Sequence, residues 1–160
     1  MVNETEIAAD ASEDEEFVAF ARDVEPKLRR AFFALAGERA ADIAADALAY
    51  GWEHWPRVRA MDNPAGYLYR VGKNRSRSRR RAPSLPPIHS VGLPEMEPRL
   101  PALLSALPER QRVCVVLVHG FQWTHAEVAV LLGVSISTVR NHLARGLASL
   151  RKELRVDTHD

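Results

Sequence analysis

Apolar residues recur at helical spacing through the first third of the chain, and the interruptions between them predict three helices. Because the N-terminus is polar and acidic, we expect a frayed arm there and order from near Glu13 onward. Pro26 interrupts the pattern where a second helix can begin with proline in its first turn, and Gly37 ends that helix. An alanine-rich third helix is expected over 39–55, with Pro56 closing it.

The pair Asn63 and Pro64 predicts the start of a fourth helix, after a loop over 57–62. Asparagine can cap a first turn through its side-chain oxygen, and proline suits the first helical position. We expect this helix to reach about Arg80 and to interleave tyrosine, leucine and valine with cationic residues. Aromatic and basic side chains together favour single-stranded nucleic acid. The alternative is a solvated helix whose tyrosines pack into the core, and for the leucine and valine we prefer that reading.

Six prolines between 82 and 101 deny that segment a continuous helix or an inner strand, so they predict a linker. The chain is therefore expected to be all-α, with two small helical bundles joined by a proline-rich linker. The N-terminal domain would span 13–81 and the C-terminal domain 102–154. The second domain should contain a helix over 109–119, and the polar tail after Leu154 should be disordered.

The strongest local pattern lies between 123 and 151, where two helices are expected on either side of a tight turn. Thr124 and Glu127 have the Thr-x-x-Glu spacing of a capping box at the start of the first helix. Gly133 follows the last apolar residue of that helix and can take the left-handed conformation that ends it. Ser135 can cap the second helix, so the pattern predicts a helix-turn-helix.

In the second of these helices, apolar residues from Val139 to Leu150 recur at spacings of four, four and three and form one buried stripe. A step of about 100° per residue places small and polar side chains on the opposite face. The candidate base-reading residues on that face are Ser137, Thr138, Arg140, Asn141, Ala144 and Arg145. Asparagine can pair bidentately with adenine and arginine with guanine in a major groove. The alternative is an amphipathic hairpin whose outer face is polar because it meets water.

The formal net charge of +1 conceals a segregation of charge along the chain. Residues 4–25 carry nine acidic side chains and a single arginine, whereas residues 70–81 carry seven basic side chains and no acidic one. Like charges at this density repel one another unless a partner neutralises them. We therefore expect the basic run, including Arg79 and Arg80, to contact phosphates.

Several classes of function are not expected from the composition. One cysteine, Cys114, lies in an apolar run, and the six histidines are scattered, so we expect no metal site and no disulfide within the chain. No paired carboxylates or nucleophile motif point to an enzyme or to a cofactor. The longest apolar run is far short of the roughly 20 residues of a membrane span, and no signal peptide is evident. We expect a cytoplasmic protein without membrane insertion.

Three stretches together resemble the extracytoplasmic-function (ECF) sigma factors of bacterial RNA polymerase. Those stretches are ADIAADALAYGWEHW, NPAGYLYRVGKNRSRSRRR and LPERQRVCVVLVHGFQWTHAEVAVLLGVSISTVRNHLARGLASLRKEL. They resemble, in order, the family's polymerase-binding helix, its promoter-melting helix and its reader of the upstream element. Their order and the proline-rich connector make the resemblance much more specific than any one stretch.

The resemblance implies a role in transcription initiation as a non-enzymatic, DNA-binding regulator whose partners are core RNA polymerase and promoter DNA, both duplex and melted. It implies that the −35 element is read by the helix-turn-helix face given above. The melted −10 element would contact Asn63, Tyr67, Arg70, Lys73, Asn74, Arg79 and Arg80. Polymerase would rest on Asp42, Ala45 and Asp46. The family often has Trp where this chain has Tyr67, and usually has Gln where it has Ala45.

Two other classes of function stay open. The stretch TVRNHLARG also resembles the effector domain of LuxR-type regulators, which bind duplex DNA without melting it. The basic helix after Asn63 argues against that class, because duplex reading does not need it. The third class is an interaction protein that docks on polymerase and carries its basic residues as plain surface. An anti-sigma factor is a further partner that the resemblance leaves open.

Overall fold

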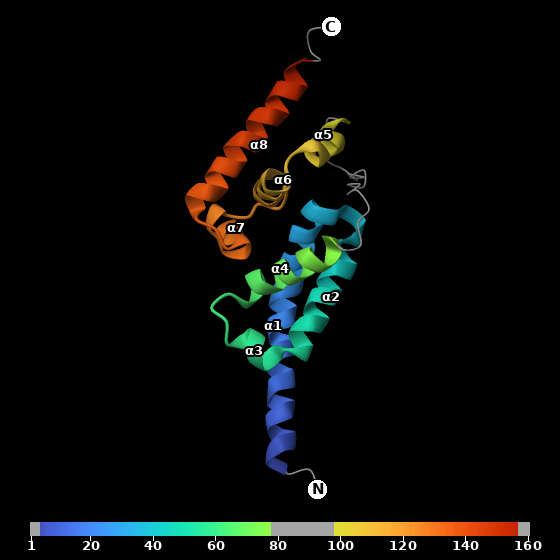
Figure 1. Ribbon diagram of the computed structural model, residues 1–160, viewed down its shortest axis with the longest axis vertical. Helices are drawn as coiled ribbons and strands as arrows, with labels where there is room; N and C mark the ends of the chain where they lie inside the picture. Colours follow the sequence, from blue (N-terminus) through green and yellow to red (C-terminus); the bar gives the residue numbers. More distant parts are fainter. Residues whose placement is uncertain (1–3, 78–97, 157–160) are drawn as a thin grey trace.

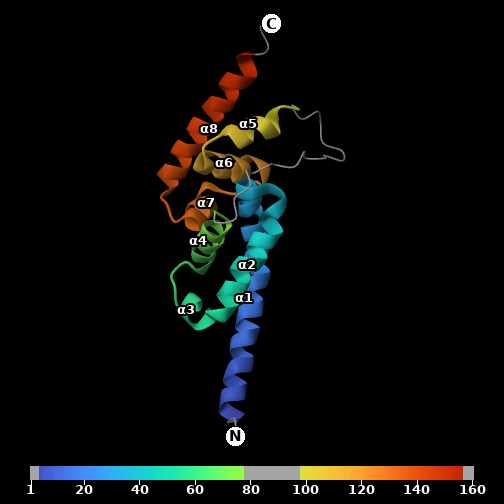
Figure 2. The same cartoon turned by 45° about the vertical axis from the view of Figure 1, so that its right-hand side comes forward.

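The computed structural model describes residues 4–77 and 98–156, and within these ranges every regular element is a helix. The molecule is elongated: the first helix projects beyond the rest at one end, and the last helix leads to the C-terminus at the other (Figure 1). The fold is all-α, as predicted from the sequence. In both views the C-terminal half, in yellow to red, lies above the N-terminal half, in blue to green, along the long axis (Figures 1 and 2).

The first helix, α1 (Glu4–Ala36), is one continuous element, which contradicts two predictions. It begins at Glu4 rather than near Glu13, and it passes through Pro26 without a break. The missing proline hydrogen bond costs about 3 kcal/mol in a helix interior. Burial of Val24 and Leu28 on either side offsets that cost, because both pack into the core. The helix ends as predicted, with Gly37 at a φ of 58°.

The chain next forms the short 3₁₀ turn η1 (Gly37–Arg39), α2 (Ala40–Glu53) and α3 (Trp55–Arg59). The sequence predicted a loop over 57–62 and a helix closed by Pro56. Instead, Pro56 lies in the first turn of α3, where proline is well tolerated. Two ion pairs connect Arg59 to Glu13 and Glu16 of α1, at 3.4 and 2.7 Å.

The next long helix, α4 (Pro64–Arg77), starts as predicted, because the Asn63 side-chain oxygen accepts the backbone N–H of Gly66 at 2.9 Å. It packs on α1 and α2 around Phe32, Leu28 and Leu68, all of which are fully buried. Gly72 permits this approach, since a Cβ there would lie 2.4 Å from the Phe32 ring. The expected last turn to Arg80 lies outside the described residues.

The C-terminal half contains α5 (Leu100–Ala106), α6 (Glu109–Val115), the π-helical turn η2 (Val116–Gly120), α7 (His125–Leu132) and α8 (Ile136–Val156). Helix α8 continues two residues past the expected end at Leu154, and α5 begins inside the segment predicted as linker. Most of that segment lies outside the described residues. The Cys114 side chain is fully buried, as predicted, and burial raises the pKa of its thiol to about 11.

The two halves pack against each other, an arrangement that the sequence did not predict. Helix α6 contacts α1, and α7 contacts α4. The buried guanidinium of Arg112 lies at this joint and donates to the backbone oxygens of Ala34, Ser105 and Leu107 at 2.8, 3.2 and 3.1 Å. The Phe33 and Phe121 rings add an edge contact at 6.1 Å. One charged side chain therefore ties the end of α1 to the C-terminal half.

Candidate nucleic-acid interface

The helix-turn-helix is built by three local devices. The Thr124 side chain accepts the N–H of Glu127 at 3.1 Å, and the Glu127 carboxylate accepts the N–H of Thr124 at 2.7 Å. Gly133 ends α7 at a φ of 65°, in the left-handed region. The Ser135 hydroxyl then accepts the N–H of Thr138 at 3.1 Å and caps α8. All three features were predicted from the sequence: the capping box begins α7, and Gly133 and Ser135 form the turn that leads into α8.

The predicted base-reading face of α8 is open. Val139, Leu143 and Leu150 are buried on the opposite side of the helix. Thr138 is half-buried, and the other predicted residues of the face are exposed, namely Ser137, Arg140, Asn141, Ala144 and Arg145. Between the two faces lies His142, whose pKa is lowered by burial and by the nearby charges of Arg110 and Arg145. The helix therefore presents a continuous polar strip with small side chains at its centre.

The predicted −10 residues on α4 have varied surroundings. Arg70 and Asn74 are exposed, whereas Asn63 and Lys73 contact the C-terminal half. The Asn63 amide donates to the backbone oxygen of Val130 at 2.6 Å. Lys73 pairs with Glu109 at 2.5 Å and is 18% exposed. The remaining two predicted residues, Arg79 and Arg80, lie outside the described residues.

Tyr67 belongs to an aromatic and cationic cluster that sequence reasoning did not assemble. Its hydroxyl lies 3.1 Å from the hydroxyl of Tyr50, and the Arg57 guanidinium lies over its ring at 5.9 Å. The Tyr50 ring stacks on His54 at 4.1 Å and carries Arg75 at 4.9 Å from its centroid. We call these five residues the tyrosine cluster. No local sequence signal reveals it, because its members come from three helices and one turn.

Tyr69, the second tyrosine of the aromatic and basic helix, does not belong to the exposed surface of α4. It is 3% exposed and stacks on Phe32 at 5.3 Å, and burial raises its pKa. Two residues apart on a helix means about 200° of rotation, so the two tyrosines face opposite ways. The core reading is correct for Tyr69, and Tyr67 alone can meet a partner.

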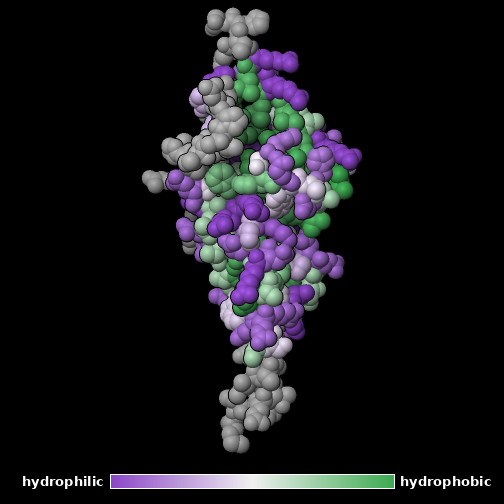
Figure 3. Space-filling view, turned by 180° about the vertical axis from the view of Figure 1, so that it is seen from behind, coloured by the Kyte–Doolittle hydropathy of each residue, from purple (hydrophilic) through white to green (hydrophobic). Residues whose placement is uncertain are grey.

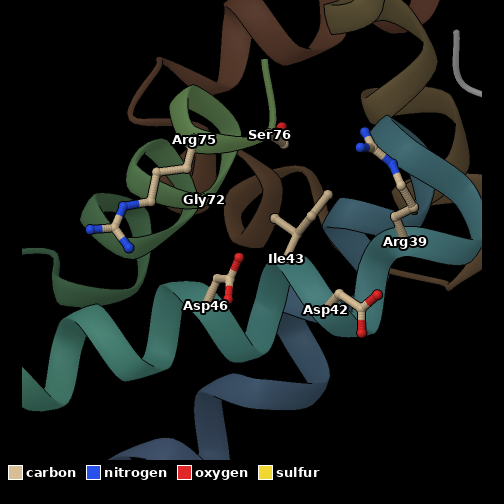
Figure 4. Close-up of a pocket in the computed structure, with 7 residues that line it drawn as sticks. All are labelled: Arg39, Asp42, Ile43, Asp46, Gly72, Arg75 and Ser76. Atoms are coloured by element: carbon tan, nitrogen blue, oxygen red, sulfur yellow. The ribbon is translucent and has the colours of Figure 1, made fainter. Parts of the chain in front are cut away.

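The predicted polymerase-binding residues Asp42, Ala45 and Asp46 are exposed on α2. The two aspartates help to line a hollow of about 180 Å³ between α2 and α4. Its other wall is formed by Gly72, Arg75 and Ser76 of α4 (Figure 4). The hollow therefore has two acidic side chains of the predicted polymerase-binding surface on one wall and the basic Arg75 on the other.

A larger hollow, of about 530 Å³, lies between the two halves. Lys27 and Arg30 of α1 line one side of it, and Phe121, Trp123 and Val130 line the other. Seen from behind, polar residues cover much of the middle of the molecule, with apolar residues showing between them mainly in the upper part (Figure 3).

Among the described residues, no helix is long and apolar enough to span a membrane. In the same residues, no group of His, Cys, Asp and Glu side chains is arranged to hold a metal ion.

The position of Glu109 between two basic residues of α4 was not predicted from the sequence. Its carboxylate lies between Lys73 and Arg77, 2.5 and 3.5 Å from their nitrogens. Burial raises the pKa of Glu109, but the hydrogen bonds and charges of the two cations outweigh that effect and leave the pKa below its usual value. The pairing joins residues far apart in the chain, so no spacing in the sequence could reveal it.

Comparison with known proteins agrees with this geometry. Residues 98–150 match the family Sigma-70, region 4, which contains the helix-turn-helix. The chain is similar to the RNA polymerase sigma-E factor of Streptomyces coelicolor, with 33% identity over 126 residues that cover 72% of this chain and 71% of the relative. The sigma-E factor of Streptomyces avermitilis is 32% identical over the same length, covering 72% and 70%.

The fold is similar to that of the sigma factor RpoE from Bartonella quintana, solved in complex with the anti-sigma factor NepR. The TM-score is 0.63 at 21% identity, and the match covers 89% of this chain and 99% of the other. This likeness agrees with the all-α architecture. From the shared sequence and the matched region, the chain belongs to the extracytoplasmic-function sigma factor family of bacterial RNA polymerase.

Proposed function

We propose that this sigma factor binds core RNA polymerase and directs it to promoters, reading the −35 element with α8 and the melted −10 element with α4. The observation that carries the proposal is the open face of α8, with Asn141 and Arg145 exposed on a capped helix-turn-helix. The N-terminal domain would be 13–81, the linker 82–101 and the C-terminal domain 102–154. We assign the chemistry of transcription to the polymerase, so the chain itself would not be an enzyme. Its place of action would be the cytoplasm, where it would meet the polymerase.

Reading of the −35 element follows from the chemistry of the α8 face. Arginine pairs bidentately with guanine and asparagine with adenine, each worth about 1–3 kcal/mol of discrimination. Ala144 lies between Asn141 and Arg145 in the chain and is exposed, so it lets the helix approach the bases. Arg140 would take a base or a phosphate at the edge of the strip.

Opening of the −10 element needs different groups. Unstacking a base costs a few kcal/mol, so a melting surface must offer aromatic faces and cations along the strand. Tyr67, Arg70 and Asn74 supply an aromatic ring, a charge and an amide on the accessible side of α4. Lys73 and Asn63 would add a charge and an amide once the C-terminal half no longer holds them.

Polymerase would dock on Asp42, Ala45 and Asp46, which share an exposed face of α2. Charge reversal in Asp46→Arg should abolish co-elution with core polymerase and run-off transcription, while leaving the helix content unchanged. Glu153→Arg, an exposed site on α8, is the matched control. Normal co-elution of the Asp46 variant would contradict this docking surface. Because the Bartonella relative was solved with an anti-sigma factor, we also expect a protein of that class to compete with polymerase.

Melting is tested separately from binding. Tyr67→Ala and Asn74→Ala in the holoenzyme should spare the closed complex and impair opening, measured as lost permanganate reactivity of unpaired thymines. Normal opening by both variants would make α4 a structural helix. Duplex binding that requires no polymerase, with no transcription in its presence, would favour a LuxR-type regulator instead. Co-elution without promoter-specific transcription would favour a docking protein.

A further inference from the structure

We propose that Tyr50 is a positioning residue that holds Tyr67 in the orientation needed to stack on an unpaired DNA base. The inference rests on the proposed function of α4 and deepens it. The two hydroxyls lie 3.1 Å apart, so one phenol donates to the other and links α2 to α4. Tyr67 is half-buried, and its ring keeps an accessible part beside the exposed Arg57.

Tyr50 is suited to this task because its own ring is held firmly. His54 stacks on it with an angle of 22° between the rings, and the His54 Nδ1 lies 2.9 Å from the backbone oxygen of Tyr50. The Arg75 guanidinium also lies over the ring, at 4.9 Å. A ring fixed in this way gives its hydroxyl a defined position. Tyr67 is then anchored at its far end and needs little reordering to receive a base.

The ligand of this site is an unpaired nucleobase in a strand whose phosphates are neutralised by nearby arginines. Base stacking on an aromatic side chain tolerates any sequence, because every base has a π face. Arg57 and Arg75 border the tyrosine pair from α3 and α4. The cluster therefore adds two cations, Arg57 and Arg75, beside the stacking surface of Tyr67, and neither was among the proposed −10 residues.

The test compares the variants Tyr50→Phe, Tyr67→Phe and Tyr67→Ala in holoenzyme bound to fork-junction promoter DNA. The promoter sequence is first selected from a pool of random duplexes. The single-stranded arm of the DNA carries 2-aminopurine. Tyr50→Phe keeps the ring and loses the hydroxyl. It should reduce strand affinity by about two- to tenfold, the range of one hydrogen bond, and weaken the quenching of 2-aminopurine by stacking. The double variant Tyr50→Phe/Tyr67→Phe should bind the strand as strongly as Tyr67→Phe alone, because the two hydroxyls act through one contact.

The outcomes separate this inference from the proposed function. If Tyr67→Ala leaves affinity and quenching unchanged, α4 does not bind the strand and both fail. If Tyr67→Ala weakens binding while Tyr50→Phe matches the unaltered protein, the positioning role of Tyr50 is overturned and the function of α4 stands. Additive effects of the two phenylalanine variants would overturn it as well, since they would show independent roles.

A different observation, the joint between the halves, carries a second inference. We infer that Glu109 takes the place of a DNA phosphate and covers part of the strand-binding side of α4. A carboxylate has anionic acceptor oxygens, as a phosphate does, and those of Glu109 form ion pairs with Lys73 and Arg77. Lys73 cannot serve the strand while it binds Glu109. Strand binding then requires that DNA replace the carboxylate.

The same covering occurs at the other end of α4. There the Asn63 amide donates to the backbone oxygen of Val130, in α7, instead of to DNA. Both contacts come from the C-terminal half, so one movement of that half would release both residues. The open face of α8 is not involved, and −35 reading would remain available while the −10 surface is covered.

The test measures binding of the full chain to a single-stranded oligothymidine at low salt. Glu109→Gln should raise affinity by about two- to fivefold, the range that one partly exposed ion pair contributes. Glu109→Lys should repel Lys73 and Arg77 and increase the radius of gyration in small-angle X-ray scattering. Glu153→Gln, an exposed acid on the same half, should do neither.

Unchanged or weaker binding by Glu109→Gln would overturn this inference, as would an unaltered radius of gyration in Glu109→Lys. Lys73→Gln is measured beside them in the same assay. If it leaves oligothymidine affinity unaltered, the proposed role of α4 fails. If it weakens binding while Glu109→Gln has no effect, the strand surface is real and Glu109 does not cover it.

Discussion

The two proposed nucleic-acid surfaces of this sigma factor differ in how they meet solvent. The reading face of α8 is exposed, and the devices that shape it lie within a few residues of one another. The strand face of α4 is partly covered, because Asn63 and Lys73 bind groups on the C-terminal half. A surface formed by one capped helix is ready for DNA at once, whereas a surface shared between halves depends on their arrangement.

A substitution that disrupts the packing of α8 beneath its exposed face should have the largest effect on stability and duplex binding. Val139→Asp buries an unpaired charge under α8, where Val139 is fully buried, and should cost on the order of 3–5 kcal/mol. We expect loss of −35 duplex binding together with loss of helix content by circular dichroism. Ile136→Asp is the control, because Ile136 is 42% exposed and an acid suits a helix N-terminus. Retained duplex binding by the Val139 variant would mean that α8 does not pack as described.

Disrupting the joint should come next. Arg112→Met leaves the backbone oxygens of Ala34, Ser105 and Leu107 without their donor and should lower the free energy of unfolding by about 3 kcal/mol in urea. Arg110→Met, at an exposed neighbouring site, should change it by less than about 0.5 kcal/mol. Equal losses in the two variants would show that the buried guanidinium does not hold the halves together.

The same contrast explains what the sequence could predict. Thr124, Gly133 and Ser135 act on their immediate neighbours, so spacing alone predicted the helix-turn-helix and the open face. Asn63 was predicted as a cap, and its oxygen does cap α4, but its amide binds Val130, sixty-seven residues away. Pairing at that distance depends on how two bundles dock, and no local pattern encodes it.

The errors in the first helix have a related cause. Pro26 disfavours a helix locally, yet Val24 and Leu28 are buried by packing against other helices, and that burial decides the outcome. The acidic residues before 17 have no apolar stripe, but Glu13 and Glu16 bind Arg59, which arrives from α3. At Pro26 a tertiary contact overrides a local preference, whereas the Arg59 pairs hold α1 only from Glu13 onward. The identities of the DNA-contacting residues remain predictions.

Removing a base contact sharpens the comparison on the open side. Asn141→Ala should weaken binding to the preferred −35 duplex by about 1–3 kcal/mol and relax base preference at one position. The fold should not change, because Asn141 is exposed. Competition binding against a set of single-base variants measures the preference. An equal loss on random duplex DNA would assign Asn141 to a phosphate instead of a base.

The smallest expected effect concerns the turn that sets the angle of α8. Gly133→Ala should cost about 1 kcal/mol, because φ is 65° there while a Cβ would meet nothing within 4 Å. The penalty is conformational and not steric, so Gly133→Asn should recover part of it, since asparagine tolerates the left-handed region. Thermal unfolding measures both variants. An alanine variant as stable as the unaltered protein would show that the turn relaxes.

The bond from Arg112 to the carbonyl of Ala34 spans 78 residues of chain. A ribosome adds about 5–20 residues per second, so about 4–16 s of synthesis separate the acceptor from its donor. Between the synthesis of Lys73 and that of Glu109, Asn63 and Lys73 exist without the groups that bind them in the folded protein. A nascent chain of this sigma factor therefore passes through a brief period in which the proposed strand-binding residues Asn63 and Lys73 are not yet held by the C-terminal half.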